Sequence, residues 1–415
     1  MKVPTPLAGL SPWPQARART LFARVRRDVR PDDDVVTAFR DGQVTLRSNR
    51  REDGFTNAVE EIGYQGVRTG DLVIHSMDGF AGAIGVSESD GKASPVVHCY
   101  RPLAQVDARF YAYALRDLAV RGFIGSLAKG IRERSTAFDA ETFRSLQLPM
   151  PPHQTQCAIA NFLDSETARI DALIAKKTRV SSLLSERRRA SIDRNVVPHV
   201  LGGVADRSSS AWPRTALKRE AMLFTDGDWI ESPYITDHGI RLLQTGNVGE
   251  GRFREQGFRY VSQETFESFG CTEVFSGDIL ISRLAGPVGC ACLAPDLGVR
   301  MIASVDVVIM RPTADIDPEF AVLWLSSTAH LELADLLARG SIMQRLSRSQ
   351  VGDMPIPLPP IEMQRQITAS LNRQLSTIDS VLASLTRQIE LLREHRQALI
   401  TAAVTGQIEI PGVAA

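Results

Sequence analysis

The chain has 415 residues, of which 43% are hydrophobic and 23% are charged, as in ordinary globular proteins. At about 150 residues per domain, this length predicts two to three domains that can each bury a core. The 48 Lys and Arg residues balance the 48 Asp and Glu residues. This zero net charge argues against a diffuse, histone-like binder of polyanions, although local basic faces are compatible with it.

Three further classes of protein are disfavoured by local features of the sequence. We find no apolar run of the roughly 20 residues that span a bilayer. The segment Met1–Gln15 contains prolines and one lysine but lacks the apolar stretch of a secretory signal. The five cysteines are odd in number and scattered, which argues against a disulfide framework and for a reducing compartment. We therefore expect a cytoplasmic protein.

The globular parts are predicted to be mixed α/β. In the first half, strands at Asp71–Ser76 and Ala83–Val86 meet across a glycine-rich turn, and a helix surrounds Phe110–Leu115. The second half repeats this order. Its predicted strands are Asp278–Ser282, Gly289–Leu293 and Val305–Met310, and its predicted helices are Phe320–Ser327 and Ala334–Arg339.

A long helix follows each globular part. A Pro-Pro pair opens each one, which predicts helices from His153 to about Arg194 and from Ile361 to about Ala403. Apolar residues recur at alternating four- and three-residue steps, the pattern of a coiled-coil seam. The predicted seam residues are Leu371, Leu375, Ile378, Leu382, Leu385, Ile389 and Leu392, with Leu163, Ile170, Ile174 and Leu184 in the first helix. We expect the two helices, each on the order of 60 Å long, to form a coiled coil; alternatively, each packs on its own globular domain.

The chain repeats itself. Pro151–Ile192 and Pro359–Ile400 align without a gap at an offset of 208 residues, and 16 of these 42 positions are identical. A weaker echo joins Thr69–Ile74 to Ser276–Ile281. The chain is therefore interpreted as a tandem duplication, in which each half has a variable globular part followed by a better matched helix.

Catalytic motifs are incomplete in this sequence. Asp71 followed by Asp90-Gly-Lys92 resembles the acidic Mg²⁺ site of a nuclease. The second half keeps the first acid as Asp278 but lacks the lysine, so the repeated aspartate is predicted to open a turn into a strand instead.

Other sites with weak signals also favour structural interpretations. The segment from Gly85 to Ala93 departs from a P-loop in its spacing and in ending on alanine. Cys290 and Cys292 are expected to be buried thiols rather than zinc ligands, because no second Cys/His pair lies nearby. The Pro-Pro-aromatic signature of an amino-methyltransferase is also absent.

Four segments carry a resemblance to a known family. Leu148–Leu163 and Pro357–Leu371 both read Pro-Pro, then a Gln, an Ile and a Leu at helical spacing, without the Glu that the family usually has before the Gln. Ile240–Gly251 and Leu399–Ile408 resemble further family segments. Over essentially its whole length, the chain is thus similar to the DNA specificity (S) subunits of type I restriction–modification enzymes.

This resemblance implies a fold and a function. Target-recognition domains at 1–150 and 201–358 would be separated by long antiparallel helices at 151–200 and within 359–415, which form a coiled coil with pseudo-two-fold symmetry. Each domain would read one half of an asymmetric, bipartite site in double-stranded DNA. The implied partners are two modification (adenine methyltransferase) subunits and the restriction (motor/nuclease) subunits. S-adenosylmethionine, ATP and Mg²⁺ are expected in those partners, and this chain is expected to have neither a catalytic residue, a metal nor a cofactor.

DNA contacts are expected from basic and amide side chains. We favour two segments that occupy similar places before the Pro-Pro helices, together with one arginine outside them. These candidates are Lys129, Arg132, Arg134, Arg339, Gln344, Arg345 and Arg283. Further candidates are Arg47, Arg50, Arg51, Arg252 and Arg254. Each of them alone is more typical of a solvated surface charge than of a DNA contact.

Two other functions stay open at this point. One is a DNA-acting enzyme, either a nuclease or a methyltransferase, with an unrecognised active site. The other is a coiled-coil assembly protein without affinity for DNA.

Overall fold

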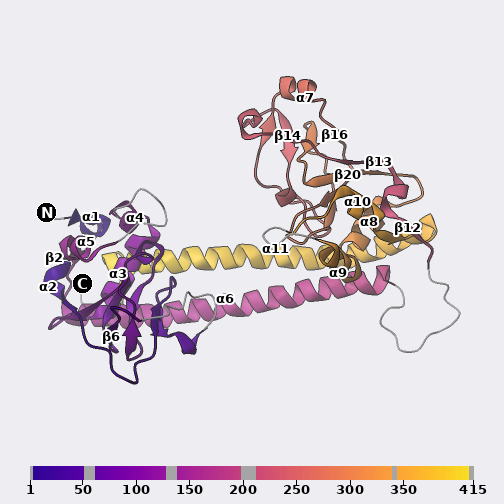
Figure 1. The fold of residues 1–415 in the computed structure, drawn as a ribbon. Coiled ribbons are helices and arrows are strands. Elements are labelled where there is room, and N and C mark those ends of the chain that lie inside the picture. The colour runs from indigo at the N-terminus through magenta and orange to yellow at the C-terminus, as the bar shows by residue number, and fades with distance from the viewer. Residues whose placement is uncertain (1–2, 51–60, 128–137, 198–211, 339–343, 411–415) are drawn as a thin grey trace, which may run out of the picture. The chain divides into compact units, whose positions relative to one another are not determined.

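A computed structural model of the chain shows two compact units (Figure 1). The structure describes residues 3–50, 61–127, 138–197, 212–338 and 344–410. Unit 1 comprises Met1–Lys177 and Arg387–Ala415, and unit 2 comprises Thr178–Thr386. Helix α6 (His153–Val196) passes from unit 1 into unit 2, and helix α11 (Ile361–Thr405) passes back. Each unit is therefore one globular domain together with half of each long helix, and both predicted long helices are confirmed.

Unit 1 is built from short strands and helices. Its strands are β1 (Val3–Pro4), β2 (Gln15–Arg17), β3 (Phe22–Val25), β4 (Val36–Ala38), β5 (Val44–Leu46), β6 (Gln65–Val67), β7 (Leu72–His75), β8 (Ile84–Val86), β9 (Gly91–Ala93), β10 (Val97–Pro102) and β11 (Leu146–Pro149). Its shorter helices are α1 (Pro6–Leu10), α2 (Ala18–Leu21), α3 (Ala108–Val120), α4 (Phe123–Leu127) and α5 (Ala140–Ser145), with the 3₁₀ turns η1 (Arg47–Asn49) and η2 (Gly79–Ala81).

The frame of unit 1 is an antiparallel sheet with the strand order β3–β10–β7–β8. β7 and β8 pair with Ile74 opposite Ile84, which confirms the two strands predicted across the glycine-rich turn. α3 packs on this sheet through Phe110, Tyr111 and Leu115, all of which are fully buried. Smaller pairings, β4–β5 and β6–β9, stand beside this frame.

Unit 2 uses similar elements. Its strands are β12 (Arg214–Ala216), β13 (Ala221–Asp226), β14 (Ile240–Leu243), β15 (Tyr260–Val261), β16 (Glu273–Val274), β17 (Ile279–Ser282), β18 (Ala291–Leu293), β19 (Met301–Ala303), β20 (Val307–Pro312) and β21 (Pro355–Pro357). Its shorter helices are α7 (Gln263–Phe269), α8 (Pro318–Leu325), α9 (Thr328–Leu337) and α10 (Arg348–Asp353), with the 3₁₀ turns η3 (Leu217–Glu220), η4 (Ser232–Tyr234) and η5 (Thr245–Asn247).

The sheet frame of unit 1 recurs in unit 2. The order β13–β20–β17–β18 is again antiparallel, and each strand corresponds to a strand of unit 1 at the same place in the order. Unit 2 adds a separate sheet, β15–β14–β19–β16, where unit 1 has its two small pairings. The duplication is thus confirmed in the shared frame, and the halves differ in the structure inserted beside it.

Each globular domain shares its core with both long helices. In unit 1, Ile159 and Leu163 of α6 and Val404 of α11 join the buried cluster around α3. In unit 2, Ile192 of α6 and Leu371 of α11 join the cluster around α8 in the same way. Burying these side chains ties helix and domain together, because apolar burial contributes about 25 cal/mol per Å².

The glutamine of the Pro-Pro motif has a structural role in both halves. Gln156 is buried; its Oε1 accepts the N–H of Asp107 at 2.9 Å, and its Nε2 donates to the Pro151 carbonyl at 2.9 Å. Gln364 repeats both bonds, with the N–H of Asp317 and the Pro359 carbonyl, each at 2.8 Å. Because Asp107 and Asp317 cap α3 and α8, the motif ties the start of each long helix to the domain before it.

Two reciprocal ion pairs fix how α6 and α11 pair. In unit 1, Asp171 of α6 lies 2.9 Å from Nε of Arg396 of α11. In unit 2, Arg188 of α6 donates from Nε to Asp379 of α11 at 2.9 Å. The two aspartates are equivalent in the repeat, and so are the two arginines. Partner numbers on α11 fall as residue numbers on α6 rise, so the helices are antiparallel.

The predicted seam residues divide into two groups. Five are buried, and the other six are only half-buried. The buried ones are Leu163, Ile170, Leu371, Leu375 and Leu382. The half-buried ones are Ile174, Leu184, Ile378, Leu385, Ile389 and Leu392. Leu163, Leu371 and Leu375 are buried because they pack into the domain cores, so packing on a globular domain, offered above as an alternative to the coiled coil, also applies at the helix ends.

Two expectations from the sequence bear on chain organisation. The predicted domain boundaries follow the starts of the long helices, whereas the compact units divide both helices near their middles.

Among the described residues, no single helix combines the length and apolar character needed to cross a membrane. Only α8 and α9 taken together reach this length and apolar character, and they are bent by 62° where they meet.

Candidate nucleic-acid interface

The two halves present equivalent sheet ends. β7 ends at His75 and β17 ends at Ser282, and the next residue of each accepts one backbone hydrogen bond from a distant segment. The Ser76 carbonyl accepts the N–H of Phe138 at 2.8 Å, and the Arg283 carbonyl accepts the N–H of Leu346 at 3.0 Å. Phe138 and Leu346, which follow the two favoured segments in the sequence, are therefore bound at equivalent places in the shared frame. We call these places the sheet ends of unit 1 and unit 2.

Several predicted DNA-contacting residues lie outside the described part of the chain. These are Arg51, Lys129, Arg132, Arg134 and Arg339. Their predicted roles stay predictions.

Arg283 requires a correction. Its side chain is buried, and Nε donates to the Leu346 carbonyl at 2.8 Å, while Nη1 donates to Asp226 at 2.8 Å and to the Val305 carbonyl at 3.0 Å. The guanidinium is thus used inside the domain and is largely withdrawn from the surface. The Arg283 side chain binds the Leu346 carbonyl, and the Arg283 carbonyl accepts the Leu346 N–H. Arg283 therefore anchors the segment that carries Gln344 and Arg345.

The exposed residues at the sheet end of unit 2 are amide and basic. Gln344 and Arg345 are both exposed, as predicted for residues that contact DNA. Arg345 lies 2.7 Å from Asp306, and Arg348, at the first position of α10, lies 3.9 Å from Asp226. These carboxylates restrict where the guanidinium groups point, and the remaining N–H groups can serve a ligand.

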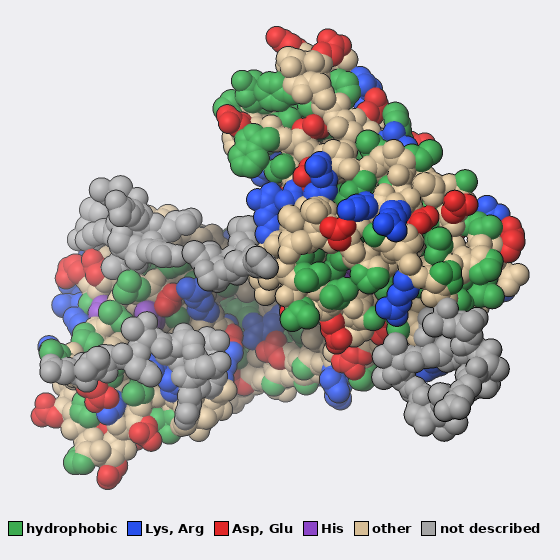
Figure 2. All heavy atoms as spheres, turned by 45° about the vertical axis from the view of Figure 1, so that its right-hand side comes forward, with side chains coloured by type: hydrophobic (Ala, Val, Ile, Leu, Met, Phe, Trp, Pro, Cys, Tyr) green, Lys and Arg blue, Asp and Glu red, His purple; other side chains and the backbone are tan. Residues whose placement is uncertain are grey.

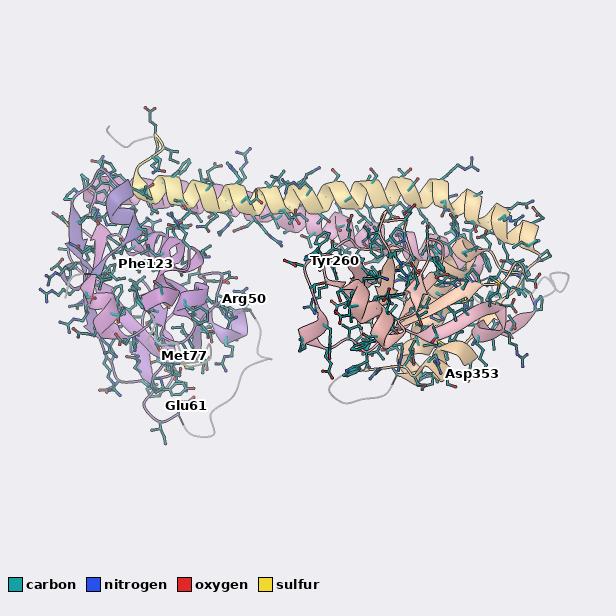
Figure 3. All side chains as sticks on the ribbon, turned by 90° about the horizontal axis from the view of Figure 1, so that it is seen from above. Arg50, Glu61, Met77, Phe123, Tyr260 and Asp353 are labelled. Carbon is teal, nitrogen blue, oxygen red and sulfur yellow. The ribbon has the colours of Figure 1, made fainter. Side chains whose placement is uncertain are left out.

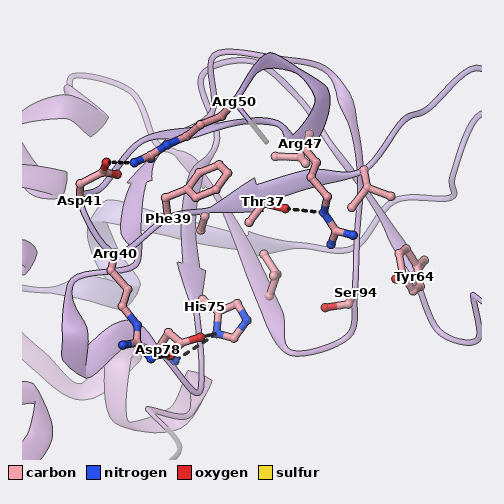
Figure 4. A pocket seen from close by; sticks show the side chains of 14 residues that line it. Thr37, Phe39, Arg40, Asp41, Arg47, Arg50, Tyr64, His75, Asp78 and Ser94 are labelled. Atoms are coloured by element: carbon pink, nitrogen blue, oxygen red, sulfur yellow. Dashed lines mark hydrogen bonds and ion pairs between the residues drawn. The ribbon is translucent and has the colours of Figure 1, made fainter. Parts of the chain in front are cut away.

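At the sheet end of unit 1, the corresponding region is hollow. A cavity of about 650 Å³ is lined by residues of β4, η1, the end of β7 and the start of β10 (Figure 4). We call it the unit 1 cavity. Its polar lining residues are Thr37, Arg40, Asp41, Arg47, Arg50, Tyr64, His75, Asp78 and Ser94. Figure 3 shows Arg50, Met77 and Glu61 on the part of unit 1 that lies away from the long helices.

Two arginines of the unit 1 cavity are held by carboxylates. Arg50 lies 2.5 Å from Asp41, and its guanidinium stacks 4.3 Å from the ring centre of Phe39. Burial raises the pKa of Asp41, but the Arg50 guanidinium outweighs it, and the pKa lies below its ordinary value. Arg40 donates from Nη2 to Asp78 at 2.8 Å.

A histidine supplies a further directed donor. The Nδ1 atom of His75 accepts the N–H of Asp78 at 3.0 Å, so the neutral ring carries its proton on Nε2. Burial lowers the pKa of His75 below its ordinary value, and the neutral form is therefore favoured.

Sequence reasoning named Arg47 and Arg50 but missed Arg40, His75 and Arg348. An arginine next to an aspartate, as in Arg40-Asp41, is common in surface loops and carries little signal by itself. These residues become a site only because five separate segments meet at one sheet end.

A third group of predicted residues lies on a braced loop of unit 2. Asn247 is buried and donates from Nδ2 to the carbonyls of Arg254 and Gln256, both at 2.9 Å. Arg241, also buried, donates to the same Gln256 carbonyl at 2.8 Å. Arg252 and Arg254 are exposed on this loop. The family-like segment around Asn247 therefore shapes a loop that displays basic side chains.

Basic side chains gather locally on the surface. Figure 2 shows Lys and Arg clustered in one area of unit 2, within a face that otherwise mixes acidic, basic and apolar groups. A neutral chain can thus carry a basic face.

The nuclease-like aspartates are turn residues, as predicted. Asp71 accepts the N–H of Arg68 at 2.9 Å and forms an ion pair with Arg27. Asp278 accepts the N–H of Phe275 at 2.9 Å and the Nε–H of Arg311 at 2.9 Å. Each carboxylate therefore binds one backbone N–H group and one arginine side chain.

The remaining sites with weak signals are also structural where the structure describes them. Lys92 lies 2.7 Å from Glu61, and Gly91–Ala93 is strand β9 rather than the start of a helix. Cys290 and Cys292 are buried, and burial raises the pKa of each thiol to about 12. No cluster of three or more potential metal ligands occurs within the described ranges.

Comparison with known proteins shows what the chain is similar to. A family model for the type I restriction modification DNA specificity domain matches residues 211–391. The chain is 22% identical over 323 residues to the EcoKI specificity subunit of Escherichia coli strain K12, and 21% identical over 296 residues to the EcoBI specificity subunit of Escherichia coli. The matches cover 74% and 65% of this chain, and 67% and 60% of those relatives.

Residues 211–391 match the specificity-domain family, and the chain is similar to the specificity subunits of type I restriction enzymes. A chain in a solved structure, described as the structural basis of complex assembly and conformational transition of the type I R-M system, has a TM-score of 0.64 at 15% identity. That match covers 95% of this chain and 98% of the solved chain, so the two share a fold.

Proposed function

We propose that this specificity subunit is non-catalytic and reads an asymmetric, bipartite site in double-stranded DNA, one half with each sheet end. The observation that carries the proposal is the contrast between the two equivalent ends. Unit 1 presents a cavity edged by Arg40 and Arg50, whereas unit 2 presents the exposed side chains of Gln344 and Arg345. A shared frame with different reading residues predicts two different half-sites.

The long helices would set the spacing of the half-sites. Both α6 and α11 run uninterrupted between the units, and an α-helix is stiff over such a length. A fixed spacing lets DNA be read at two places in one binding event.

Modification and restriction subunits are the proposed protein partners. The exposed apolar residues of the long helices include Leu173 and Leu391 in unit 1, and Leu183 and Val381 in unit 2. The two sets are equivalent in the repeat, which favours two identical modification subunits, one per unit. S-adenosylmethionine, ATP and Mg²⁺ are proposed to bind those partners.

The cytosol is the proposed compartment. All five cysteines are free thiols, and four of them are buried. A reducing environment keeps such thiols from forming disulfides.

The test uses the subunit assembled with its modification subunits. Methylated adenines are mapped by single-molecule sequencing, with and without the subunit, and footprinting locates the protected DNA. We expect two protected patches and a two-part consensus that depends on this chain. Methylation that is independent of the chain, or a lack of protection, would refute the proposal.

A matched pair of variants links one sheet end to one half-site. Arg345→Ala should alter one half of the consensus, because Arg345 is exposed at the sheet end of unit 2. Arg300→Ala is the control, since Arg300 has similar exposure and an equally close carboxylate, Glu273, but lies beside the additional sheet. An equal effect of both variants would contradict the assignment.

A separate measurement addresses the enzyme alternative. The purified chain is incubated with DNA, Mg²⁺ and S-adenosylmethionine. Cleavage or methyl transfer by this chain alone would refute a non-catalytic role.

A further inference from the structure

We propose that the unit 1 cavity is a base-reading pocket for guanine, in which Arg50 is the main hydrogen-bond donor and Arg40 the second. This inference rests on the proposed function, since it names the base that one sheet end reads. Guanine presents two acceptors, O6 and N7, in the major groove, and the forked N–H groups of arginine match them.

The direction of the Arg50 guanidinium is fixed on two sides. Asp41 holds one edge at 2.5 Å, and the Phe39 ring supports the flat face at 4.3 Å. A guanidinium has five N–H donors, so one edge can be held while another points to a ligand. Fixing the side chain in advance also lowers the entropy lost when a base binds.

Arg40 repeats this arrangement at the same cavity. Its Nη2 is held by Asp78 at 2.8 Å, and Figure 4 shows this pair beside His75. The Nε2–H group of His75 adds a donor. Val36, Ala38 and Val97 supply apolar lining, which suits the flat face of a base.

The donors and acceptors of the cavity distinguish guanine from other ligands. Adenine requires a donor and an acceptor side by side, as Asn or Gln provides, and cytosine requires an acceptor. The carboxylates of Asp41 and Asp78 are already engaged by arginines.

Unit 2 differs at the corresponding place, where the strand end is followed by the buried side chain of Arg283. There the guanidinium of Arg283 occupies the space beside Val305 and binds its carbonyl. Ser76 stands at the position of Arg283 in unit 1 and has a much shorter side chain. The guanine pocket is therefore assigned to the half-site of unit 1.

The first test uses the wild-type complex with its modification subunits and chemically altered DNA. The half-site that Arg345→Ala leaves unchanged is the one read by unit 1. Replacing its guanines one at a time by 7-deazaguanine removes only the N7 acceptor. We expect one such replacement to weaken binding about tenfold or more, since a good bidentate pair contributes about 1–3 kcal/mol to discrimination.

The second test uses variants of the cavity. Arg50→Lys keeps the charge but loses the fork, and Asp41→Asn removes the carboxylate that holds it. Both should relax discrimination at that one guanine about tenfold to a hundredfold, with smaller changes at other positions. Arg30→Lys is the control, because Arg30 is exposed and also lies near a carboxylate, Asp90 at 3.3 Å, but does not line the cavity.

The outcomes separate this inference from the proposed function. A unit 1 half-site without guanine, or uniform weakening of binding to all sequences by Arg50→Lys, overturns the guanine pocket but leaves bipartite reading intact. A consensus in which only one half depends on this chain overturns the proposed function itself.

Discussion

The pair of Arg188 and Asp379 offers a quantitative test of how the long helices are held together. The two side chains meet across α6 and α11 in unit 2, with exposed fractions of 13% and 29%. The equivalent pair in unit 1, Arg396 and Asp171, has exposed fractions of 20% and 52%. We expect the less exposed pair to have the larger coupling energy, because water screens it less.

The magnitude follows from these exposures. Exposed ion pairs contribute about 0.2–1 kcal/mol, and hydrogen bonds to charged groups that are shielded from water contribute about 1.5–3 kcal/mol. We therefore expect a coupling of about 1.5 kcal/mol for Arg188 with Asp379 and about 0.5 kcal/mol for Arg396 with Asp171. Asp379→Ala alone should cost about 2 kcal/mol, since it leaves the largely buried Arg188 without its carboxylate.

A double-mutant cycle measures both couplings. Each arginine and each aspartate is replaced by alanine, singly and together, and urea unfolding is followed by tryptophan fluorescence. Trp212, Trp229 and Trp324 lie in unit 2 and Trp13 lies in unit 1, so the signal reports mainly on unit 2. The charge-reversed double variant Arg188→Asp with Asp379→Arg should recover part of the lost stability.

Two results would refute this reasoning. Equal couplings for the two pairs would show that exposure does not govern their strength. A coupling near zero for Arg188 with Asp379, or no recovery on charge reversal, would show that the repeated residues do not hold the helices together.

Three further predictions concern other parts of the fold. Gln364→Ala should lower the free energy of unfolding by about 3 kcal/mol, because it leaves the Asp317 N–H and a carbonyl unpaired, whereas the exposed Gln366→Ala should cost little in the same urea assay. Burial lowers the pKa of His330 from 6.5 to about 4, so unfolding measured across pH should show constant stability above about pH 6.5 and a loss of up to about 3 kcal/mol toward pH 4, which His330→Gln should reduce. Leu382→Lys should destabilise the helix pair more than Leu391→Lys, since these leucines are 7% and 45% exposed; equal melting temperatures would contradict a buried seam.

Local sequence patterns predicted most of the secondary structure. The Pro-Pro pairs and the absence of glycine and proline predicted α6 and α11 to within about two residues of their ends, because helix formation depends on such local signals. The Asp71 and Asp278 repeat correctly indicated turns, since each carboxylate caps a backbone N–H only three residues away. The two halves had to be compared to reach this interpretation. The second half keeps the aspartate, as Asp278, without the lysine that a nuclease site would need, so the aspartate is explained by the turn.

The candidate site was less predictable. Arg283 had the residue type of a DNA contact, but its guanidinium is buried against Leu346, which is 63 residues away in the chain. The unit 1 cavity likewise depends on strand ends and turns that are distant in sequence. Local pattern cannot report such contacts, since any exposed-loop arginine has the same appearance until the chain is folded.

The sequence by itself thus determined the duplication, the long helices and the repeated sheet strands, because these follow from local periodicity and from the match between the halves. Its motifs also indicated the resemblance to specificity subunits. Only the tertiary structure decided which arginines face outward, that Arg283 is used inside its domain, and that a cavity lies at the sheet end of unit 1. The physical reason is that burial and hydrogen-bond pairing of a charged side chain are set by segments far apart in the chain, and these come together only on folding.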